Sequence, residues 1–236
     1  MLRWYRRAAL EKLKVLKDPL IAWHQIAVTG YENLQLSLTC QILRGDGVLL
    51  PEQLRPRGMR ISGHGGLEEE DLRAGDGKYV FLSPGRIYDL SVFPTIAFGW
   101  HVETLLRKYK VHSRREDILM DVGKLDRQME EAGKSVPERD AAMKEFAEGN
   151  TFSGEDAARE IRTARAAEIL VEGPLGIRDA DLVLLGRLEN DDGGKFEYWN
   201  AFYAIAPFSK AHELLKEVCA RKELPWKLAG VRNPRS

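Results

Sequence analysis

The sequence predicts an α+β fold in a single domain spanning residues 1–236. Short runs of β-forming residues, bounded by Gly and Pro, recur along the chain and are typical of strands. The stretches between them place apolar residues at helical spacing. No internal repeat, low-complexity block or long linker divides the chain. Helices are therefore inserted between strands that must pair across long sequence distances.

The N-terminal part predicts a helix followed by a strand. Leucines recur every three residues among Lys and Arg, which indicates a basic amphipathic helix over 1–17 that stops at Asp18-Pro19. The next run, 20–27, is apolar apart from His24 and its neighbour Gln25, and it is bounded by Pro19 and Gly30. This pattern predicts a strand buried on both faces.

Later strands follow the same pattern. The run 78–83 is rich in β-formers and is closed by Pro84-Gly85. The segment 92–109 begins as an extended pattern and becomes helical. Further strands are predicted at 117–122, 167–171, 182–185 and 198–206.

The remaining segments are predicted to be helical or irregular. A helix is expected at 32–43, and helices with loops are expected over 124–165. The segment 51–77 is rich in Pro, Gly and charge and predicts a loop, with a short strand at 59–61 as one option. The motif-bearing core spans 20–185, and 207–236 holds a closing helix near 214–218 and a basic tail.

Charge is unevenly distributed although the formal net charge is zero. Residues 1–17 hold six Lys or Arg and one Glu, and residues 221–236 hold five and one. The segment between them, 18–220, is acidic. Basic ends on an acidic body can guide a polyanion toward a site, but solvated helices and chain ends show the same pattern.

Several classes of protein are disfavoured. No apolar run is long enough for a membrane span, and the N-terminus does not resemble a secretory signal, so a cytoplasmic protein is predicted. Cys40 and Cys219 lack the spacing of a disulfide framework or a metal site. Gly63-His64-Gly65-Gly66 lacks the Lys of a phosphate-binding loop, and the absence of a GxSxG elbow disfavours a serine hydrolase.

Three polar residues lie within predicted apolar strands: His24, Tyr79 and Glu168. A carboxylate in such a strand is costly to bury unless it is paired or faces a cleft, which makes Glu168 the most informative of the three. An edge Glu that faces water or pairs with Arg165 is an equally open interpretation. A strand His or Tyr more often packs in a core than binds a ligand.

Taken together, these residues and their surroundings resemble the ADP-ribosyltransferase superfamily. His24 is followed by Ile42-Leu43-Arg44-Gly45, similar to the Ile-Leu-x-x-Gly pattern after the first motif strand. Gly75-Asp76-Gly77-Lys78-Tyr79 is similar to the Gly-x-Gly-x-Tyr motif of the poly-ADP-ribose polymerases. The segment 167–177 resembles the Ala-Glu-aliphatic-Leu-Val motif of bacterial DNA-targeting ADP-ribosyltransferase toxins. The resemblance implies a split, mostly antiparallel sheet.

The same resemblance implies a glycosyltransferase that cleaves the nicotinamide–ribose bond of NAD. Glu168 would be catalytic, because a carboxylate can stabilise an oxocarbenium-like transition state. Tyr79 would stack on the nicotinamide ring and His24 would bind a ribose hydroxyl. Ser83 lies on the same pleat face as Tyr79 and would help to bind the nicotinamide amide or the ribose. No metal site is expected.

Two rivals and one departure qualify these assignments. Gln25-Ile26 follow His24 where the polymerases have Gly-Thr, so the usual backbone contact with nicotinamide is in doubt. His64 is a rival for the first-motif His, but the sequence between it and Tyr79 leaves little room for a helix. Glu197 is a rival for the catalytic Glu, but it follows a turn-like Asp-Asp-Gly-Gly segment that is typical of a hairpin.

The acceptor of ADP-ribose would be a macromolecule, and the basic ends favour DNA or RNA. Resemblance to the toxins implies a toxin or defence effector with an antitoxin protein as a partner. One alternative is an enzyme similar to the tRNA 2′-phosphotransferases, which would use Arg60, Arg73 and Arg86 to bind a phosphate. Another is a catalytically silent module that binds nucleic acid or protein through its basic helices.

Overall fold

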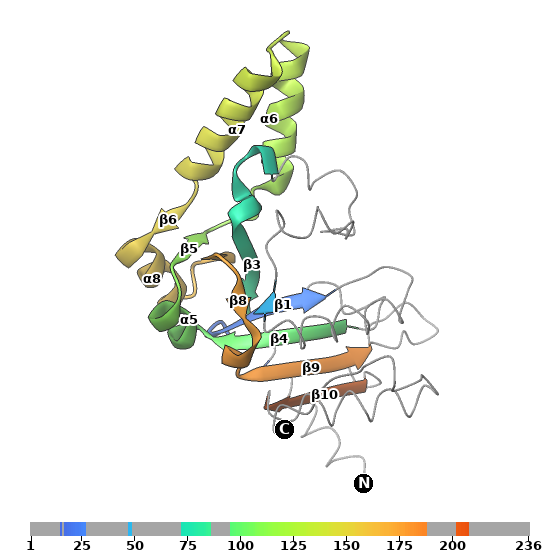
Figure 1. Ribbon diagram of the computed structural model, residues 1–236, viewed down its shortest axis with the longest axis vertical. Helices are drawn as coiled ribbons and strands as arrows, with labels where there is room; N and C mark the ends of the chain where they lie inside the picture. Colours follow the sequence, from blue (N-terminus) through green and yellow to red (C-terminus); the bar gives the residue numbers. More distant parts are fainter. Residues whose placement is uncertain are drawn as a thin grey trace. The chain divides into compact units, whose positions relative to one another are not determined.

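The computed structural model describes residues 15, 17–26, 47–48, 72–85, 95–187 and 202–207 (Figure 1). Their contacts gather into two compact units. Unit 1 comprises 1–48, 83–104 and 176–236, and unit 2 comprises 49–82 and 105–175. Helices and antiparallel strands are mixed, which confirms the α+β class. The single domain over 1–236 and the ADP-ribosyltransferase type of sheet stay predictions.

Unit 1 is built on antiparallel strands in the order β10-β9-β4-β1, and the end of β3 pairs with β1 through Ser83 and Pro84. This arrangement confirms the strands predicted at 20–27, 182–185 and 198–206. The bounds are β1 Ile21–Ile26, β3 Tyr79–Pro84, β4 Thr95–His101, β9 Leu182–Arg187 and β10 Phe202–Pro207. Three short elements are β2 Gly47–Val48, β8 Leu175–Gly176 and the 3₁₀-helix η3 Ile177–Asp179.

Aromatic side chains fill the centre of unit 1. Trp23 on β1 and Phe98 and Trp100 on β4 are all essentially inaccessible to solvent. Gly99 lies opposite Trp23 in the β1–β4 ladder, and a Cβ atom added there would come within 2.8 Å of Cζ3 of the Trp23 ring. Because real Cβ contacts are not this short, the indole can occupy its place only beside a glycine.

Helix α5 (Val102–Lys108) begins directly after β4. Val102 and Leu105 are buried, and the Val102 N–H donates to the Leu20 carbonyl at 2.9 Å. The prediction that 92–109 begins extended and becomes helical is therefore confirmed.

Unit 2 contains antiparallel strands in the order β3-β7-β5-β6. The bounds are β5 Val111–Arg114, β6 Phe152–Ser153 and β7 Glu168–Glu172. The strands at 78–83 and 167–171 are confirmed, whereas β5 and β6 were not predicted. One face of this sheet is apolar and buried, and it carries Val80, Leu82, Val111, Ile169 and Val171.

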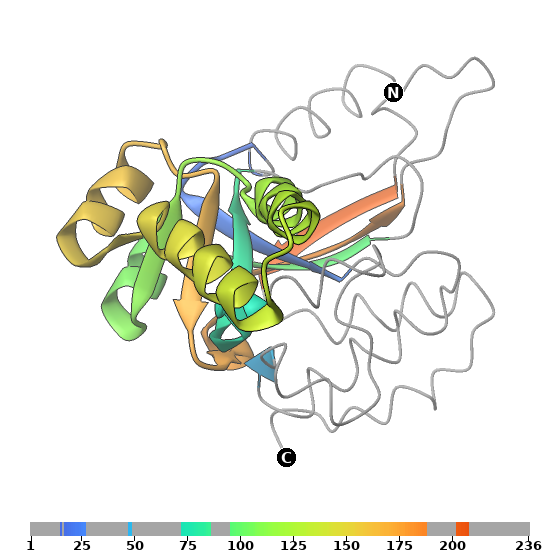
Figure 2. The same ribbon diagram turned by 90° about the horizontal axis from the view of Figure 1, so that it is seen from above.

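Three helices complete unit 2, as predicted for 124–165: α6 Leu119–Glu131, α7 Val136–Gly149 and α8 Gly154–Arg162. The strand predicted at 117–122 is wrong, because these residues lead into α6. Ile118 and Val122 are one helical turn apart and pack with Met143 and Ala147 of α7. Helices α6 and α7 lie side by side (Figures 1 and 2).

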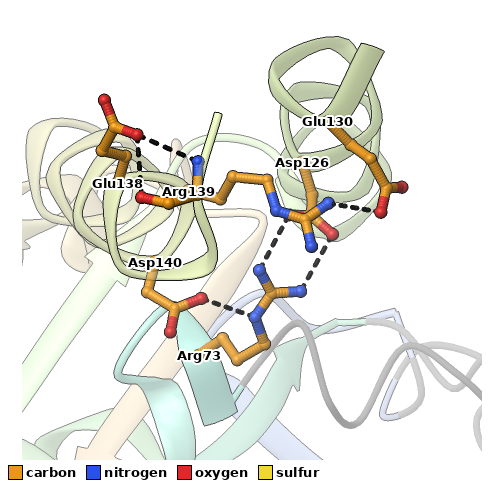
Figure 3. A network of polar contacts seen from close by, with 7 residues as sticks. Arg73, Asp126, Glu130, Glu138, Arg139 and Asp140 are labelled. Carbon is orange, nitrogen blue, oxygen red and sulfur yellow. Dashed lines mark hydrogen bonds and ion pairs between the residues drawn. The ribbon is translucent and has the colours of Figure 1, made fainter. Parts of the chain in front are cut away.

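A polar network ties the segment before β3 to both helices (Figure 3). The Arg73 guanidinium donates two bonds to the Asp126 carboxylate at 2.8 and 2.9 Å and one to Asp140 at 2.6 Å. The hydrogen bond with Asp126 is the main cause of the raised pKa of Arg73. Arg139 of α7 reaches Glu130 of α6 at 2.9 Å.

The stability of the N-terminus of α7 should depend on pH, because a carboxylate takes part in its cap. The Glu138 carboxylate accepts from the Ser135 N–H at 2.9 Å and from its hydroxyl at 2.8 Å, and these bonds lower the Glu138 pKa to about 2. A depressed carboxyl pKa adds stability at higher pH that is lost as pH falls. We expect wild-type helicity to fall between about pH 4.5 and 2 by more than that of Glu138→Gln, followed by circular dichroism. Parallel curves would contradict this, and Glu145→Gln on the same helix is the control.

Several predictions lie outside the described residues. Val15 is helical and belongs to the helix predicted over 1–17, of which little else is described. Of the predicted loop 51–77, only 72–77 is described; it forms a short helical turn and most of the 3₁₀-helix η2 (Asp76–Lys78). Four predictions also lie outside the described residues: the helices at 32–43 and 214–218, the strand option at 59–61 and the basic tail. Within the described ranges, each helix falls short of the length and apolarity of a membrane span.

Candidate functional site

A cavity of about 140 Å³ opens in unit 2 beside the first residue of β3. Its lining combines an aromatic ring, an imidazole, two hydroxyls and a buried ion pair, contributed by Asp76, Tyr79, His112, Arg114, Thr151 and Ser153. These residues come from the 3₁₀-helix η2, from β3, β5 and β6, and from the turn after α7. The cavity is therefore built by segments that are far apart in the sequence.

The register of the sheet explains why polar side chains gather here. Directly opposite residues in an antiparallel ladder share a face. Tyr79 is opposite Glu172, Arg114 is opposite Glu168, and His112 is opposite both Leu170 and Ser153. One face of the unit 2 sheet thus carries Tyr79, His112, Arg114, Ser153, Glu168 and Glu172 together with the apolar Phe81 and Leu170, whereas Val80, Leu82, Val111, Ile169 and Val171 lie on the other face.

His112 is held between a hydroxyl and a carboxylate. Its Nδ1 lies 2.7 Å from the Ser153 Oγ, and its Nε2 lies 3.1 Å from a Glu172 oxygen. Lys110 binds the same Glu172 oxygen at 2.7 Å. The bond from Lys110, followed by the one from His112, lowers the Glu172 pKa, so Glu172 is the charged acceptor of this chain of contacts.

Tyr79 is buried at the edge of the cavity. Its ring meets the His112 ring edge to face, with centroids 5.2 Å apart and planes at 63°. The Lys78 Nζ lies 5.0 Å from the Tyr79 ring centroid. A planar ring in this position offers an aromatic surface together with a nearby positive charge.

The floor of the site is a buried ion pair. Arg114 donates to Asp76 at 2.8 Å and to the Thr151 hydroxyl at 3.0 Å, and Arg114 and Asp76 are 2% and 4% exposed. Gly75, at φ 84°, begins the turn that brings Asp76 beneath β5. The Gly-Asp-Gly-Lys-Tyr segment therefore supplies a buried carboxylate and an aromatic ring to one cavity.

The structure places Tyr79 and Glu168 on the same face of the neighbouring strands β3 and β7. They lie at opposite ends of the ladder, because the residue opposite Tyr79 is Glu172 and Glu168 is four positions away, about 13 Å along the strand. Glu168 is half-buried and does not line the cavity. The carboxylate next to Tyr79 is therefore that of Glu172.

His24 and Ser83 belong to unit 1. Ser83 is opposite Trp23 in the β1–β3 ladder, so His24, the next residue, faces the other side of this pair. Ser83 shares the pleat face of Tyr79 on β3. The rivals His64 and Glu197, and the arginines Arg60 and Arg86, lie outside the described residues.

Six residues of this site were not predicted from the sequence: Asp76, His112, Arg114, Thr151, Ser153 and Glu172. His112 and Arg114 alternate along β5, a signal that a strand prediction at 111–114 would have revealed. Glu172 ends a strand that was predicted, on the same face as Glu168. In the described part of the chain, no group of three or more His, Cys, Asp and Glu could hold a metal ion.

Comparison of the chain with protein-family models, with curated proteins and with solved structures finds no match.

Proposed function

We propose that this chain is an NAD-dependent ADP-ribosyltransferase that cleaves the nicotinamide–ribose bond and transfers ADP-ribose to a macromolecule. The observation that carries the proposal is the common face of Tyr79 and Glu168 on two hydrogen-bonded strands. The motif resemblance implies one strand that begins at an aromatic residue and another that carries a Glu. The cavity beside Tyr79 adds a concave, mixed polar and apolar surface for a ligand.

The roles follow from the chemistry of the bond that breaks. Positive charge develops on the ribose as nicotinamide leaves, and the Glu168 carboxylate stabilises it. Tyr79 stacks on the nicotinamide ring, and Ser83 on the same face binds the amide or the ribose. His24 remains the candidate for a ribose hydroxyl, although its side chain faces away from Ser83 across the β1–β3 pair.

A nucleic acid is the acceptor that we favour, because the basic ends of the chain would attract a polyanion. Activity on DNA or RNA would fit a toxin or defence effector held in check by an antitoxin protein. The phosphotransferase alternative has less support, because Arg73, one of its three arginines, is bound to two aspartates. A catalytically silent binding module is the remaining alternative.

The test uses the full chain and NAD labelled on its adenosine part. Incubation with duplex DNA, single-stranded DNA, RNA or a protein mixture is followed by detection of free nicotinamide and of label on each macromolecule. We expect nicotinamide release together with label on one class of acceptor. Absence of NAD turnover and of NAD binding in every mixture would exclude the transferase and leave the binding module.

Tyr79 variants test the stacking role. Replacing Tyr79 by Leu removes the aromatic face and should weaken NAD binding about fivefold, since ring stacking contributes on the order of 1 kcal/mol beyond burial. Tyr79→Phe keeps the ring and should bind NAD as the wild type does. Titration calorimetry measures both, and equal affinity of the Leu and Phe variants would contradict stacking.

A further inference from the structure

The contacts of His112 define which of its nitrogens can accept a proton. Glu172 is charged and is also bound by Lys110, so it accepts a hydrogen bond from the Nε2–H of His112. That tautomer leaves Nδ1 as an acceptor, and the Ser153 hydroxyl, 2.7 Å away, donates to it. An imidazole that takes a hydroxyl proton on one side and is oriented by a carboxylate on the other is the arrangement that activates a serine.

Ser153 also occupies a backbone position that suits a nucleophile, at the junction of a strand and a helix. It is the last residue of β6 and the residue before α8, which begins with Gly154 at φ 58°. A serine at the start of a helix commonly caps it, but the Ser153 side chain makes no capping bond and contacts His112 instead. The first N–H groups of a helix have no acceptor within it and can stabilise a developing oxyanion.

The cavity sets the size and charge of a substrate. About 140 Å³ is close to the volume of a protein cavity that holds benzene, so a small acyl or aryl group fits. Ala74 and Ala147 add apolar surface to the lining. Two acidic residues, Asp76 and Glu148, and two basic residues, Lys78 and Arg114, also line the cavity, so their formal charges cancel and a neutral substrate is favoured.

We propose that Ser153 is a nucleophile of an esterase site in unit 2, with His112 as general base, Glu172 as a positioning residue and small neutral carboxylic esters as substrates. The Ser153 Oγ bonds to the ester carbonyl carbon as its proton passes to His112 Nδ1. The ester C–O bond breaks, and the leaving alcohol takes the proton from His112. Water then attacks the acyl-serine as its proton passes to His112 Nδ1; the acyl–Oγ bond breaks, the Ser153 Oγ takes that proton from His112, and the carboxylic acid leaves.

This site was not visible in the sequence because its parts come together through strand pairing. Ser153 lies in Thr-Phe-Ser-Gly, not in GxSxG, and His112 and Glu172 approach it only through the ladders of β5 with β6 and β7. The proposal does not depend on the NAD reaction. Serine labelling and NAD turnover therefore succeed or fail separately.

The test is covalent labelling of the full chain by phenylmethanesulfonyl fluoride, whose phenyl ring matches the size of the cavity. Attack of the Ser153 Oγ on sulfur displaces fluoride, and His112 takes the proton. Peptide mass spectrometry compares Ser153 with Ser135, which also directly precedes a helix but whose hydroxyl contacts Glu138 and not a histidine. We expect Ser153 to be labelled on the order of 100-fold faster than Ser135.

Variants separate activation from mere exposure. Ser153→Ala should lose the label, and Ser135→Ala should leave labelling of Ser153 unchanged. His112→Gln should slow labelling about 100-fold. Glu172→Gln should lower the maximal labelling rate more than about tenfold while the reagent concentration for half-maximal rate is unchanged, which a merely structural role would not produce.

Equal labelling of Ser153 and Ser135 in the wild type would overturn the proposal, as would full reactivity of a folded His112→Gln or Glu172→Gln chain. If His112→Gln fails to fold, the Ser153 to Ser135 ratio in the wild type and the Glu172→Gln rate decide the question. Hydrolysis of 4-nitrophenyl acetate and butyrate, lost in Ser153→Ala, would establish the esterase reaction. Failure of both esters to turn over in a chain that is labelled would overturn the assignment of substrate class.

Discussion

Glu168→Gln is expected to abolish ADP-ribosyl transfer, with kcat lowered on the order of 10³-fold and the fold unchanged. The substitution removes the negative charge and keeps the volume, so the loss would measure stabilisation of the ribose cation in the transition state. NAD affinity should change little, because positive charge develops on the ribose only in the transition state. Nicotinamide release and label transfer under saturating NAD measure the effect.

Glu172→Gln is the informative partner of this variant. Glu172 lies four residues further along β7, on the same face as Glu168 and directly opposite Tyr79. Loss of transfer in Glu168→Gln with activity in Glu172→Gln would support the motif assignment. The reverse would show that the carboxylate beside Tyr79 serves the reaction and that Glu168 does not. Glu145→Gln on α7 controls for a general effect of losing a carboxylate.

Asp76→Ala is expected to destabilise unit 2 by about 3–5 kcal/mol. The substitution leaves the Arg114 guanidinium buried with Thr151 as its remaining side-chain hydrogen bond, and an uncompensated buried charge carries a large desolvation penalty. Denaturant unfolding measures the free energy. Hydrogen exchange of the β5 amides would localise the loss to this unit.

Two further variants control this prediction. Asp121→Ala breaks an exposed pair with Lys124, and its effect should stay below about 1 kcal/mol. The double variant Asp76→Leu with Arg114→Met removes both charges and should recover most of the stability, because an apolar pair of similar size does not leave a buried ion. A double variant as unstable as Asp76→Ala would show that the carboxylate acts otherwise than by pairing with Arg114.

Local patterns predicted the strands well where a strand is a nearly continuous run of apolar residues. β1, β3 and β7 are such strands, and each was placed within about two residues. The segment around Ile118 and Val122 was misassigned because a short apolar run does not reveal its period. Its helical period becomes evident only with the α7 residues that it contacts.

The polar strand β5 escaped prediction for a different reason. His112, Ser113 and Arg114 do not form a typical strand sequence, yet all are buried because neighbouring strands and side chains cover them. Glu160 of α8 is likewise 2% exposed and is paired with Arg115. Such residues look like surface residues in the sequence, since their partners are 38 to 60 positions away.

For the site, the sequence indicated Tyr79 because its motif is local. Gly75 and Gly77 flank Asp76 immediately before β3, so the turn and the Tyr79 ring belong to one short stretch of sequence. The cluster of His112, Ser153 and Glu172 depends on the register of three strands and has no local signature. A one-residue slip of β5 would turn His112 and Arg114 to the apolar face.

The pairing of β3 with β7 also bears on how the chain folds during synthesis. Tyr79 to Leu82 are made long before Glu172 and its neighbours, whereas α6 and α7 contact each other across a short turn. The helical pair can therefore form early, and closure of the β3–β7 ladder is a late, slow step. Until then Val80 and Leu82 sit on a strand without its β7 partner, and this apolar edge is the natural point for a chaperone to bind or for aggregation to begin.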